Sequence, residues 1–172
     1  MRPVRYAMIG TGTAAELLLA PAIAAVPTAT LWSVVSRTIE RAEQFAAEHR
    51  AESPTPAYQS LEACLADPEL DAVIVATPDA LHAEQAIAAA RAGKHVFCEK
   101  PLSMDLAECA AVEAEAAKHP HLKVMIGFVR RFDASYQDAQ KSIASGAIGR
   151  PFLVRSETCD QNDPSGFFVK FA

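Results

Sequence analysis

The sequence has no block of like-charged residues and no excess of positive charge. Its 172 residues include 16 Lys and Arg against 21 Asp and Glu, which gives a formal net charge of -5 and a sequence pI near 5.5. Nucleic acids and anionic membrane surfaces bind proteins through clusters of basic side chains. The composition therefore predicts neither as a partner and is typical of a mildly acidic globular protein.

Long hydrophobic runs and paired cysteines are also missing. The apolar run that ends at Gly10 is too short for a signal-peptide core or a membrane span, so the expected compartment is the cytoplasm. The four cysteines form no CxxC pair and have no metal-ligand spacing with the five histidines, so we expect no metal site. We expect reduced and mostly buried thiols at Cys64, Cys98, Cys109 and Cys159.

Apolar segments rich in β-branched residues alternate along the chain with longer alanine-rich segments of helical period. This alternation predicts an α/β fold, with a doubly wound parallel sheet covered by helices. The expected strands are 4–9, 31–35, 71–76, 95–98 and 122–126, and the expected helices are 17–25, 39–49, 79–92 and 105–119, with a short helix after Ser60.

The length suits one complete domain and a remainder, because 172 residues bury one good core and begin a second without finishing it. We place the first domain at 1–127 and the remainder at 128–172. In the remainder we expect a helix over 132–145 and an alternating strand over 152–158. That strand needs partners that the sequence does not contain, so we expect a truncated second α/β domain.

A glycine-rich segment lies between the first expected strand and the first expected helix. It consists of Gly10, Thr11, Gly12, Thr13, Ala14 and Ala15. Gly10 would allow a tight turn, Gly12 would let the backbone approach a pyrophosphate, and Ala15 would permit close helix-strand packing. The start of the helix would supply free N–H groups to the anion. In this setting the segment predicts a Rossmann-like dinucleotide site rather than a simple glycine turn.

The second expected strand ends in Ser36 and Arg37, where an NAD-selective site usually offers an acidic side chain to the ribose 2′-hydroxyl. A serine hydroxyl and a guanidinium suit a 2′-phosphate, so the sequence favours NADP over NAD. Two other roles for Arg37 stay open. It could stack on the adenine of either cofactor, or it could be a solvated residue at a helix start.

Two further strand ends carry candidate residues. Ala76-Thr77-Pro78 follows the central strand, at the edge where open α/β sheets bind ligands, and we expect it to contact the cofactor. His82, on the first turn of the next helix, could line the same cleft or bond locally.

Glu99-Lys100-Pro101 follows the next strand, and Lys100 is the candidate catalytic residue. Its ammonium could stabilise the alkoxide that develops as hydride leaves a substrate alcohol. The alternative for Glu99 and Lys100 is a surface ion pair before a loop.

The order and spacing of these motifs, together with Gly127-Phe-Val-Arg-Arg-Phe-Asp133, resemble the glucose-fructose oxidoreductase, inositol dehydrogenase and rhizopine catabolism (Gfo/Idh/MocA) family. The last segment is most similar to the inositol dehydrogenase branch. The resemblance implies an NAD(P)-binding domain and then an open-sheet domain, with the substrate in the cleft between them and with the open sheet as the interface of a homo-oligomer.

The resemblance also implies roles for single residues. Lys100 would position the reacting hydroxyl, while Glu99 would contact the cofactor ribose or orient Lys100. The bond between Lys100 and Pro101 can be cis, a form nearly confined to bonds before proline. Arg130 or Arg131 would lie near the nicotinamide, and we take Arg131 as the cofactor-binding candidate.

The implied reaction is hydride transfer between the nicotinamide and a secondary hydroxyl of a sugar or an inositol-like polyol. The family's acid-base pair is an aspartate with a histidine four residues later. Asp160 and Asp163 have no such histidine, so we expect this catalytic segment to be absent from the chain. Two alternatives are a non-catalytic NAD(P)-binding sensor or partner module and a domain for another nucleotide-containing ligand such as S-adenosylmethionine.

Overall fold

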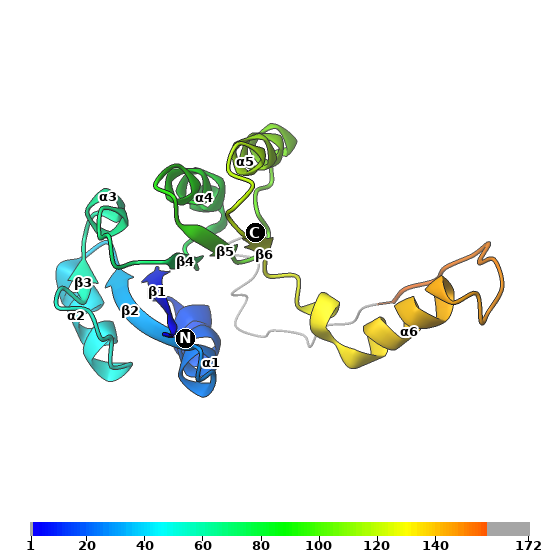
Figure 1. Cartoon of the computed structure of the whole chain (residues 1–172), viewed down its shortest axis with the longest axis horizontal. Coiled ribbons are helices and arrows are strands. Elements are labelled where there is room, and N and C mark those ends of the chain that lie inside the picture. Colours follow the sequence, from blue (N-terminus) through cyan, green and yellow to red (C-terminus); the bar gives the residue numbers. More distant parts are fainter. Residues whose placement is uncertain (1, 158–172) are drawn as a thin grey trace, which may run out of the picture. The chain divides into compact units, whose positions relative to one another are not determined.

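A computed structural model describes residues 2–157 of the chain. Six parallel strands form one sheet in the order β3-β2-β1-β4-β5-β6 (Figure 1). This is the strand order of a doubly wound dinucleotide-binding sheet, and the predicted fold class is confirmed. The strands are β1 (Val4–Ile9), β2 (Ala29–Val35), β3 (Ala57–Tyr58), β4 (Ala72–Val75), β5 (His95–Cys98) and β6 (Val124–Ile126).

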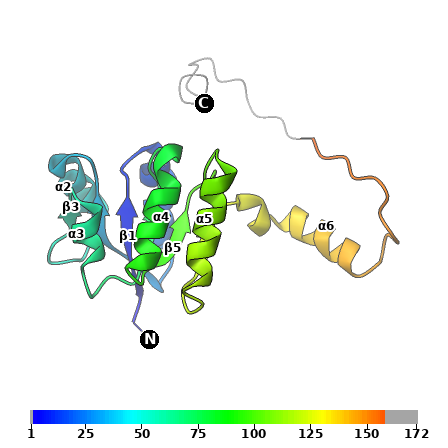
Figure 2. The ribbon, with the colours of Figure 1, turned by 90° about the horizontal axis from the view of Figure 1, so that it is seen from above.

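Helices cover both faces of the sheet because the strands bury side chains on both. Ala7 and Ile9 of β1 pack in the core on one face, and Met8 packs in the core on the other. Figures 1 and 2 show the two helical layers. One layer contains α1 (Ala20–Ala25) and α2 (Ile39–Glu48), and the other contains α3 (Leu61–Leu65), α4 (His82–Arg91) and α5 (Leu106–Ala117).

The first helix contains a wider turn that the sequence pattern does not reveal. A π-helical segment, η1 (Ala15–Leu19), precedes α1, and the N–H of Ala20 donates to the carbonyl of Ala15. Pro21 follows at the start of α1 and has no N–H to donate. The regular hydrogen-bond ladder is therefore interrupted here, as it commonly is where a helix widens locally.

The edge strand β3 is a second difference from the sequence prediction. The expected strands do not include this segment, but Ala57 and Tyr58 pair with the end of β2. The N–H of Val34 also donates to the carbonyl of Pro56 at 2.9 Å. A two-residue strand is too short to show an alternating pattern, and proline is tolerated at a sheet edge.

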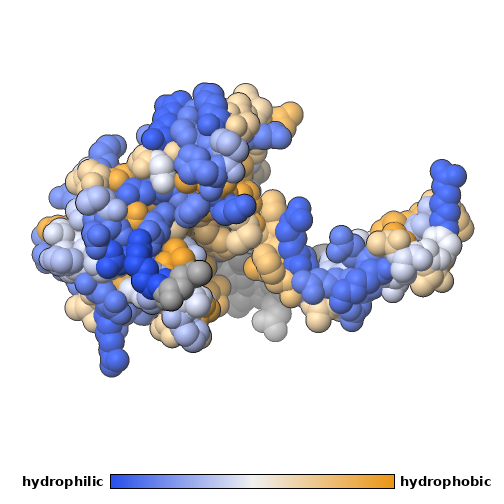
Figure 3. Space-filling model, viewed as in Figure 1, coloured by the Kyte–Doolittle hydropathy of each residue, from blue (hydrophilic) through white to orange (hydrophobic). Residues whose placement is uncertain are grey.

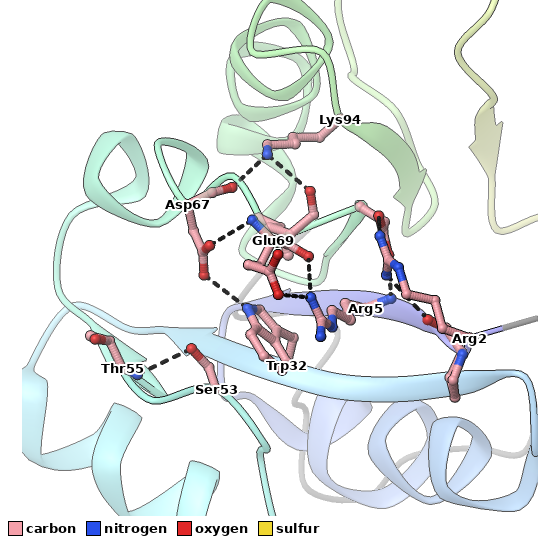
Figure 4. A network of polar contacts seen from close by, with 11 residues as sticks. Arg2, Arg5, Trp32, Ser53, Thr55, Asp67, Glu69 and Lys94 are labelled. Atoms are coloured by element: carbon pink, nitrogen blue, oxygen red, sulfur yellow. Dashed lines mark hydrogen bonds and ion pairs between the residues drawn. The ribbon is translucent and has the colours of Figure 1, made fainter.

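Polar contacts join strands and loops at the amino edge of the sheet (Figure 4). The indole N–H of Trp32 donates to the carboxylate of Asp67 at 2.8 Å. Buried Lys94 donates to the carbonyl oxygens of Asp67 and Leu70 at 2.7 and 2.9 Å. These bonds fix the loop that leads into β4. The ion pairs of this edge are Arg2 with Asp71 and Arg5 with Glu69.

The chain divides into two compact units after Phe128. The described part of the second unit contains a short helix, η3 (Val129–Phe132), and then α6 (Ala134–Ala144), which begins where the Asp133 side chain accepts a bond from the Ser135 N–H. The expected strand over 152–158 is not found in its described part, 152–157, which has no regular structure. A strand needs a neighbour for its hydrogen bonds, and no described residue supplies one.

The described cysteines have the predicted character. Cys64 and Cys98 are buried, Cys109 is partly buried, and all three are free thiols. Burial raises the pKa of Cys64 to about 11 and that of Cys98 to about 12, so both stay protonated at neutral pH. Cys159 lies outside the described residues.

The described residues contain no metal-ligand cluster and no helix that could span a membrane. Within residues 2–157, no three His, Cys, Asp or Glu side chains come together as ligands would. In the same range, no helix has both the length and the apolar character needed to cross a bilayer. Figure 3 shows hydrophilic and hydrophobic residues interspersed over the visible face of the first unit.

The buried carboxylate of Glu115, on α5, forms an ion pair with Arg91 at the end of α4. The Glu115 side chain is 8% exposed and accepts hydrogen bonds from Arg91 at 3.1 Å, Lys118 at 3.0 Å and His119 at 3.3 Å. The bonds from Arg91 and Lys118 lower the pKa of Glu115 to about 2. The carboxylate is therefore ionised over the whole physiological range.

Replacing Glu115 by glutamine should lower stability in a pH-dependent way. Because the pKa of Glu115 is about 2 in the fold against an ordinary 4.5, its contribution is complete above about pH 4.5 and is lost as the pH falls toward 2. In urea unfolding, Glu115→Gln should be less stable than the wild type at neutral pH and should approach it near pH 2 to 3. Glu113→Gln, exposed on the same helix, is the control. A gap that does not change with pH would contradict the assignment.

Candidate active site

The carboxyl ends of β2, β1, β4 and β5 lie side by side at one edge of the sheet. Ile9 of β1 pairs with Val35 of β2 and with Val75 of β4, and Val75 pairs with Cys98 of β5. Open α/β sheets bind ligands at this edge, and the reversal of strand order between β1 and β4 marks the crevice. The turns predicted to carry the site therefore share one edge, and they begin at Gly10, Ser36, Ala76 and Glu99.

Gly10 makes the closest backbone approach at this edge. Its φ is +101°, and a Cβ built on it would lie 2.6 Å from the carbonyl oxygen of Ala76. The Gly10 N–H donates to the carbonyl of Val35 at 2.9 Å, so the turn is bonded to β2 as well. Only glycine has both the conformational freedom and the missing side chain that this position requires.

Gly12 and the start of the helix leave open space. A Cβ built on Gly12 would meet nothing within 4 Å. Helical backbone begins at Thr13, and Gly12, Thr13 and Ala14 are exposed while Ala15 is fully buried. The amides of this first turn are of the kind that bind anions, because they precede the first intrahelical bond, from Glu16 to Gly12. The geometry fits the predicted pyrophosphate site.

The end of β2 lies against the glycine-rich turn. The hydroxyls of Thr11 and Ser36 are 3.1 Å apart and share a hydrogen bond, while the Arg37 side chain is exposed. Sequence reasoning missed Arg41, whose guanidinium donates to the carbonyl of Thr11 at 3.4 Å. Its signal was a second arginine four residues after Arg37, on the first turn of α2. A cavity of about 90 Å³ lies here, lined by Thr11, Glu16, Arg41, Gln44, Phe45 and Glu48.

The turn after β4 is held by side chains of α4. Thr77 donates its hydroxyl to Gln85 at 2.6 Å, and Pro78 is exposed. His82 is 1% exposed, and its two ring nitrogens lie 2.7 Å from the carbonyl oxygen of Pro101 and 2.8 Å from that of Thr77. Of the two roles left open for His82, local bonding is the one that these contacts show, and a contact with the cofactor stays a prediction.

The turn after β5 presents Lys100. The bond between Lys100 and Pro101 is cis, as the resemblance implied. The N–H of Lys100 donates to the Glu99 carboxylate at 3.3 Å, and the Lys100 side chain is exposed. A Cβ on Gly127 would lie 3.2 Å from the Glu99 carboxylate, so this glycine makes room for it. Within residues 2–157 the Lys100 ammonium has no ion-pair partner, which disfavours the surface ion pair with Glu99.

Arg130 and Arg131 both lie in η3 of the second unit. Arg130 forms an ion pair with Asp133 at 3.3 Å and lies 5.4 Å from the ring centroid of Tyr136. Arg131 is exposed, and its carbonyl accepts a hydrogen bond from Gln137 at 2.9 Å. The expected contact between Arg131 and the cofactor stays a prediction.

Comparison with known proteins shows that the chain is similar to oxidoreductases. A family model, GFO_IDH_MocA, described as an oxidoreductase family with an NAD-binding Rossmann fold, matches residues 4–128. The scyllo-inositol 2-dehydrogenase (NAD(+)) of Bacillus subtilis (strain 168) is 39% identical over 169 residues, which cover 97% of this chain and 48% of the relative. The chain thus spans about half the length of the curated relatives that it matches.

Two solved structures are similar to the chain. The scyllo-inositol dehydrogenase from Lactobacillus casei, with bound NAD(H) and scyllo-inositol, has a TM-score of 0.77 and 29% identity and covers 86% of this chain and 43% of its own. A 3-ketoreductase from Actinomadura kijaniata, in complex with NADP, has a TM-score of 0.73 and 32% identity and covers 86% and 46%. Relatives with this first unit therefore occur with either nicotinamide cofactor.

The two glycines of the turn should respond differently to an added methyl group. Gly10→Ala should lower the free energy of unfolding by roughly 2–4 kcal/mol, because the new Cβ combines a positive φ with a clash against Ala76. Gly12→Ala, which has no positive φ and open space, is the matched control and should change it by less than about 0.5 kcal/mol. Urea unfolding of both variants measures this, and equal losses would refute the assigned geometry.

Proposed function

The chain belongs to the Gfo/Idh/MocA family of oxidoreductases, and on this basis we propose that it binds NADP or NAD at the carboxyl edge of β1, β2 and β4. The proposed reaction is hydride transfer to or from a secondary hydroxyl carbon of a sugar or an inositol-like polyol. The observation that carries the proposal is the row of strand ends, which brings the glycine turn and Lys100 to one edge. The cofactor supplies the hydride chemistry when it is bound.

The glycine turn fits a pyrophosphate in shape and in charge. The missing side chain of Gly10 allows the backbone to pass close to the Ala76 carbonyl. The open space at Gly12 would allow an anion to approach the first amides of the helix. Free amides and the positive end of the helix dipole both favour a negative group at this point. The backbone can therefore hold the cofactor phosphates without a charged side chain.

The end of β2 supports a preference for NADP. Ser36 and Arg37 occupy the position where a carboxylate would bind a ribose 2′-hydroxyl, and Arg41 adds a second guanidinium beside Thr11. Guanidinium groups bind phosphate through short, charge-assisted hydrogen bonds. A 2′-phosphate placed here would therefore meet hydrogen-bond donors and positive charge.

Removing the Arg37 guanidinium should weaken NADP binding and leave NAD binding nearly unchanged. A lost charge-assisted bond costs about 1.5–3 kcal/mol, so the Kd for NADP should rise roughly 10- to 100-fold in Arg37→Ala. Titration followed by nicotinamide fluorescence of the reduced cofactors measures this. The control Lys123→Ala removes an exposed positive charge just before β6, at the amino edge. Equal losses for both cofactors would remove the 2′-phosphate argument and would favour stacking on adenine.

Lys100 is the residue that we propose to act on the substrate. Its ammonium is exposed at the edge where the nicotinamide would lie and is not neutralised by a described carboxylate. A positive charge beside the reacting oxygen favours its deprotonated form, and it therefore lowers the barrier to hydride departure. Glu99 holds the backbone N–H of Lys100 and so orients the turn.

The Lys100→Met variant should separate chemistry from binding. In a form of the protein that shows turnover, kcat should fall roughly 100- to 10,000-fold, while the Kd for NADP should change only a few fold. Steady-state oxidation of inositols and related polyols, with cofactor titration in parallel, measures both quantities. Equal losses in kcat and in cofactor affinity would contradict the role, and a wild-type protein that binds NADP but never turns over would support the non-catalytic module.

We also propose that 1–127 is the cofactor domain and that 128–172 begins the substrate domain. The division of contacts after Phe128 supports this, and so does the exposure of Phe152 and Leu153, which are 98% and 77% exposed. Apolar side chains of this size are normally covered by further structure. Subunit association through an open sheet in the substrate domain and a cytoplasmic location, in keeping with the free thiols, belong to the same proposal.

A further inference from the structure

His82 bridges two turns of the candidate site from a buried position. It is the first residue of α4, and its side chain is 1% exposed. Its Nδ1 lies 2.7 Å from the carbonyl oxygen of Pro101, and its Nε2 lies 2.8 Å from the carbonyl oxygen of Thr77. The ring therefore joins the turn after β4 to the turn after β5.

The chemistry of the two partners decides how many protons the ring carries. A carbonyl oxygen only accepts hydrogen bonds, and a neutral imidazole has one N–H and one lone pair. With one proton, the ring would direct a lone pair at a carbonyl oxygen less than 3 Å away. Both contacts are hydrogen bonds only when both nitrogens carry a proton, which gives the ring a positive charge.

We propose that His82 is a doubly protonated positioning residue that ties the Thr77 turn to the Pro101 turn. Two charge-assisted bonds offset part of the cost of burying the charge. The bridge also continues toward the cofactor site, since Ala76, next to Thr77, contacts Gly10. The consequence for Lys100, which precedes Pro101, rests on the proposed function.

No carboxylate of a described residue bonds to the ring, so the carbonyl oxygens are the groups that hold its protons. The helix α4 packs against η2 (Asp79–Leu81), α3, β4, β5 and α5. The Cys98 thiol of β5 supplies no counter-charge, because burial raises its pKa to about 12. The other titratable groups on these elements are Glu62, Cys64, Asp79, Glu84, Arg91, His95, Glu108, Cys109, Glu113 and Glu115, and the turns that lead to and from β5 add Lys94, Glu99, Lys100 and Asp105.

The protonation state can be read directly from the ring nitrogens. In protein labelled with ¹⁵N-histidine, long-range proton-nitrogen correlation near pH 7 should show two protonated nitrogens for His82, identified by the signals lost in His82→Asn. His95 is the internal control, because its Nδ1 accepts the N–H of Lys123 at 2.9 Å and must be unprotonated. A single protonated nitrogen in His82 would overturn the proposal.

The positioning role can be separated from general stability by amide hydrogen exchange. The Glu99 N–H bonds to Val75 at 2.9 Å near the bridge, and the Val96 N–H bonds to Lys123 at 2.8 Å at the far end of the same strand. In His82→Leu, exchange at Glu99 should accelerate about tenfold more than exchange at Val96. His82→Asn, which keeps one donor, should give a smaller difference, and it is compared directly with the wild type if the leucine variant does not fold. Equal acceleration at the two amides would overturn the positioning role.

Neither measurement uses a cofactor or a substrate. A failure of the bridge would therefore appear in the histidine spectrum or in the exchange ratio. A failure of the proposed dehydrogenase function would appear only in cofactor titration and turnover. The two outcomes are distinguishable in the same wild-type preparation.

Discussion

The contact between Gly10 and the carbonyl of Ala76 is the constraint on which the candidate site depends. At this point β1 and β4 are neighbours, yet the chain leaves them toward opposite faces of the sheet. A side chain at Gly10 would push the two strand ends apart, since its Cβ would lie 2.6 Å from the Ala76 oxygen. Because glycine lets them meet, the first helix begins close to the edge with its free amides beside the crevice.

The two edges of the sheet are stabilised in different ways. The amino edge is closed by long-range bonds from Trp32 and Lys94 to the loop before β4. At the carboxyl edge, backbone bonds continue one residue past each strand, as in Ala76 to Ile9 at 2.8 Å. The backbone there is fixed while the side chains remain accessible. The turns that would position a ligand therefore have a backbone as rigid as that of the sheet.

The sequence predicts those parts of the structure that local patterns control. The bounds of β1 and the role of Gly10 follow from an apolar run and a glycine between a strand and a helix. The contacts of Arg41 and His82 do not, because they form between segments that only the folded sheet brings together. The short strand β3 and the absent strand over 152–157 have a common cause. Whether a few extended residues become a strand depends on a neighbouring strand, which a local pattern does not contain.

The position of Lys100 combines an exposed charge with a fixed backbone. A long, exposed ammonium group normally loses considerable rotamer entropy when it is placed at a reacting atom. Here the backbone on both sides of it is already held, by the bond from Glu99 to Val75 and by the bridge from His82 to Pro101. Only the side-chain torsions remain to be ordered, so a bound substrate would organise one side chain rather than a whole loop. Preorganisation of this kind makes a positioned charge useful in catalysis, since the energy of substrate binding is not consumed in folding the site.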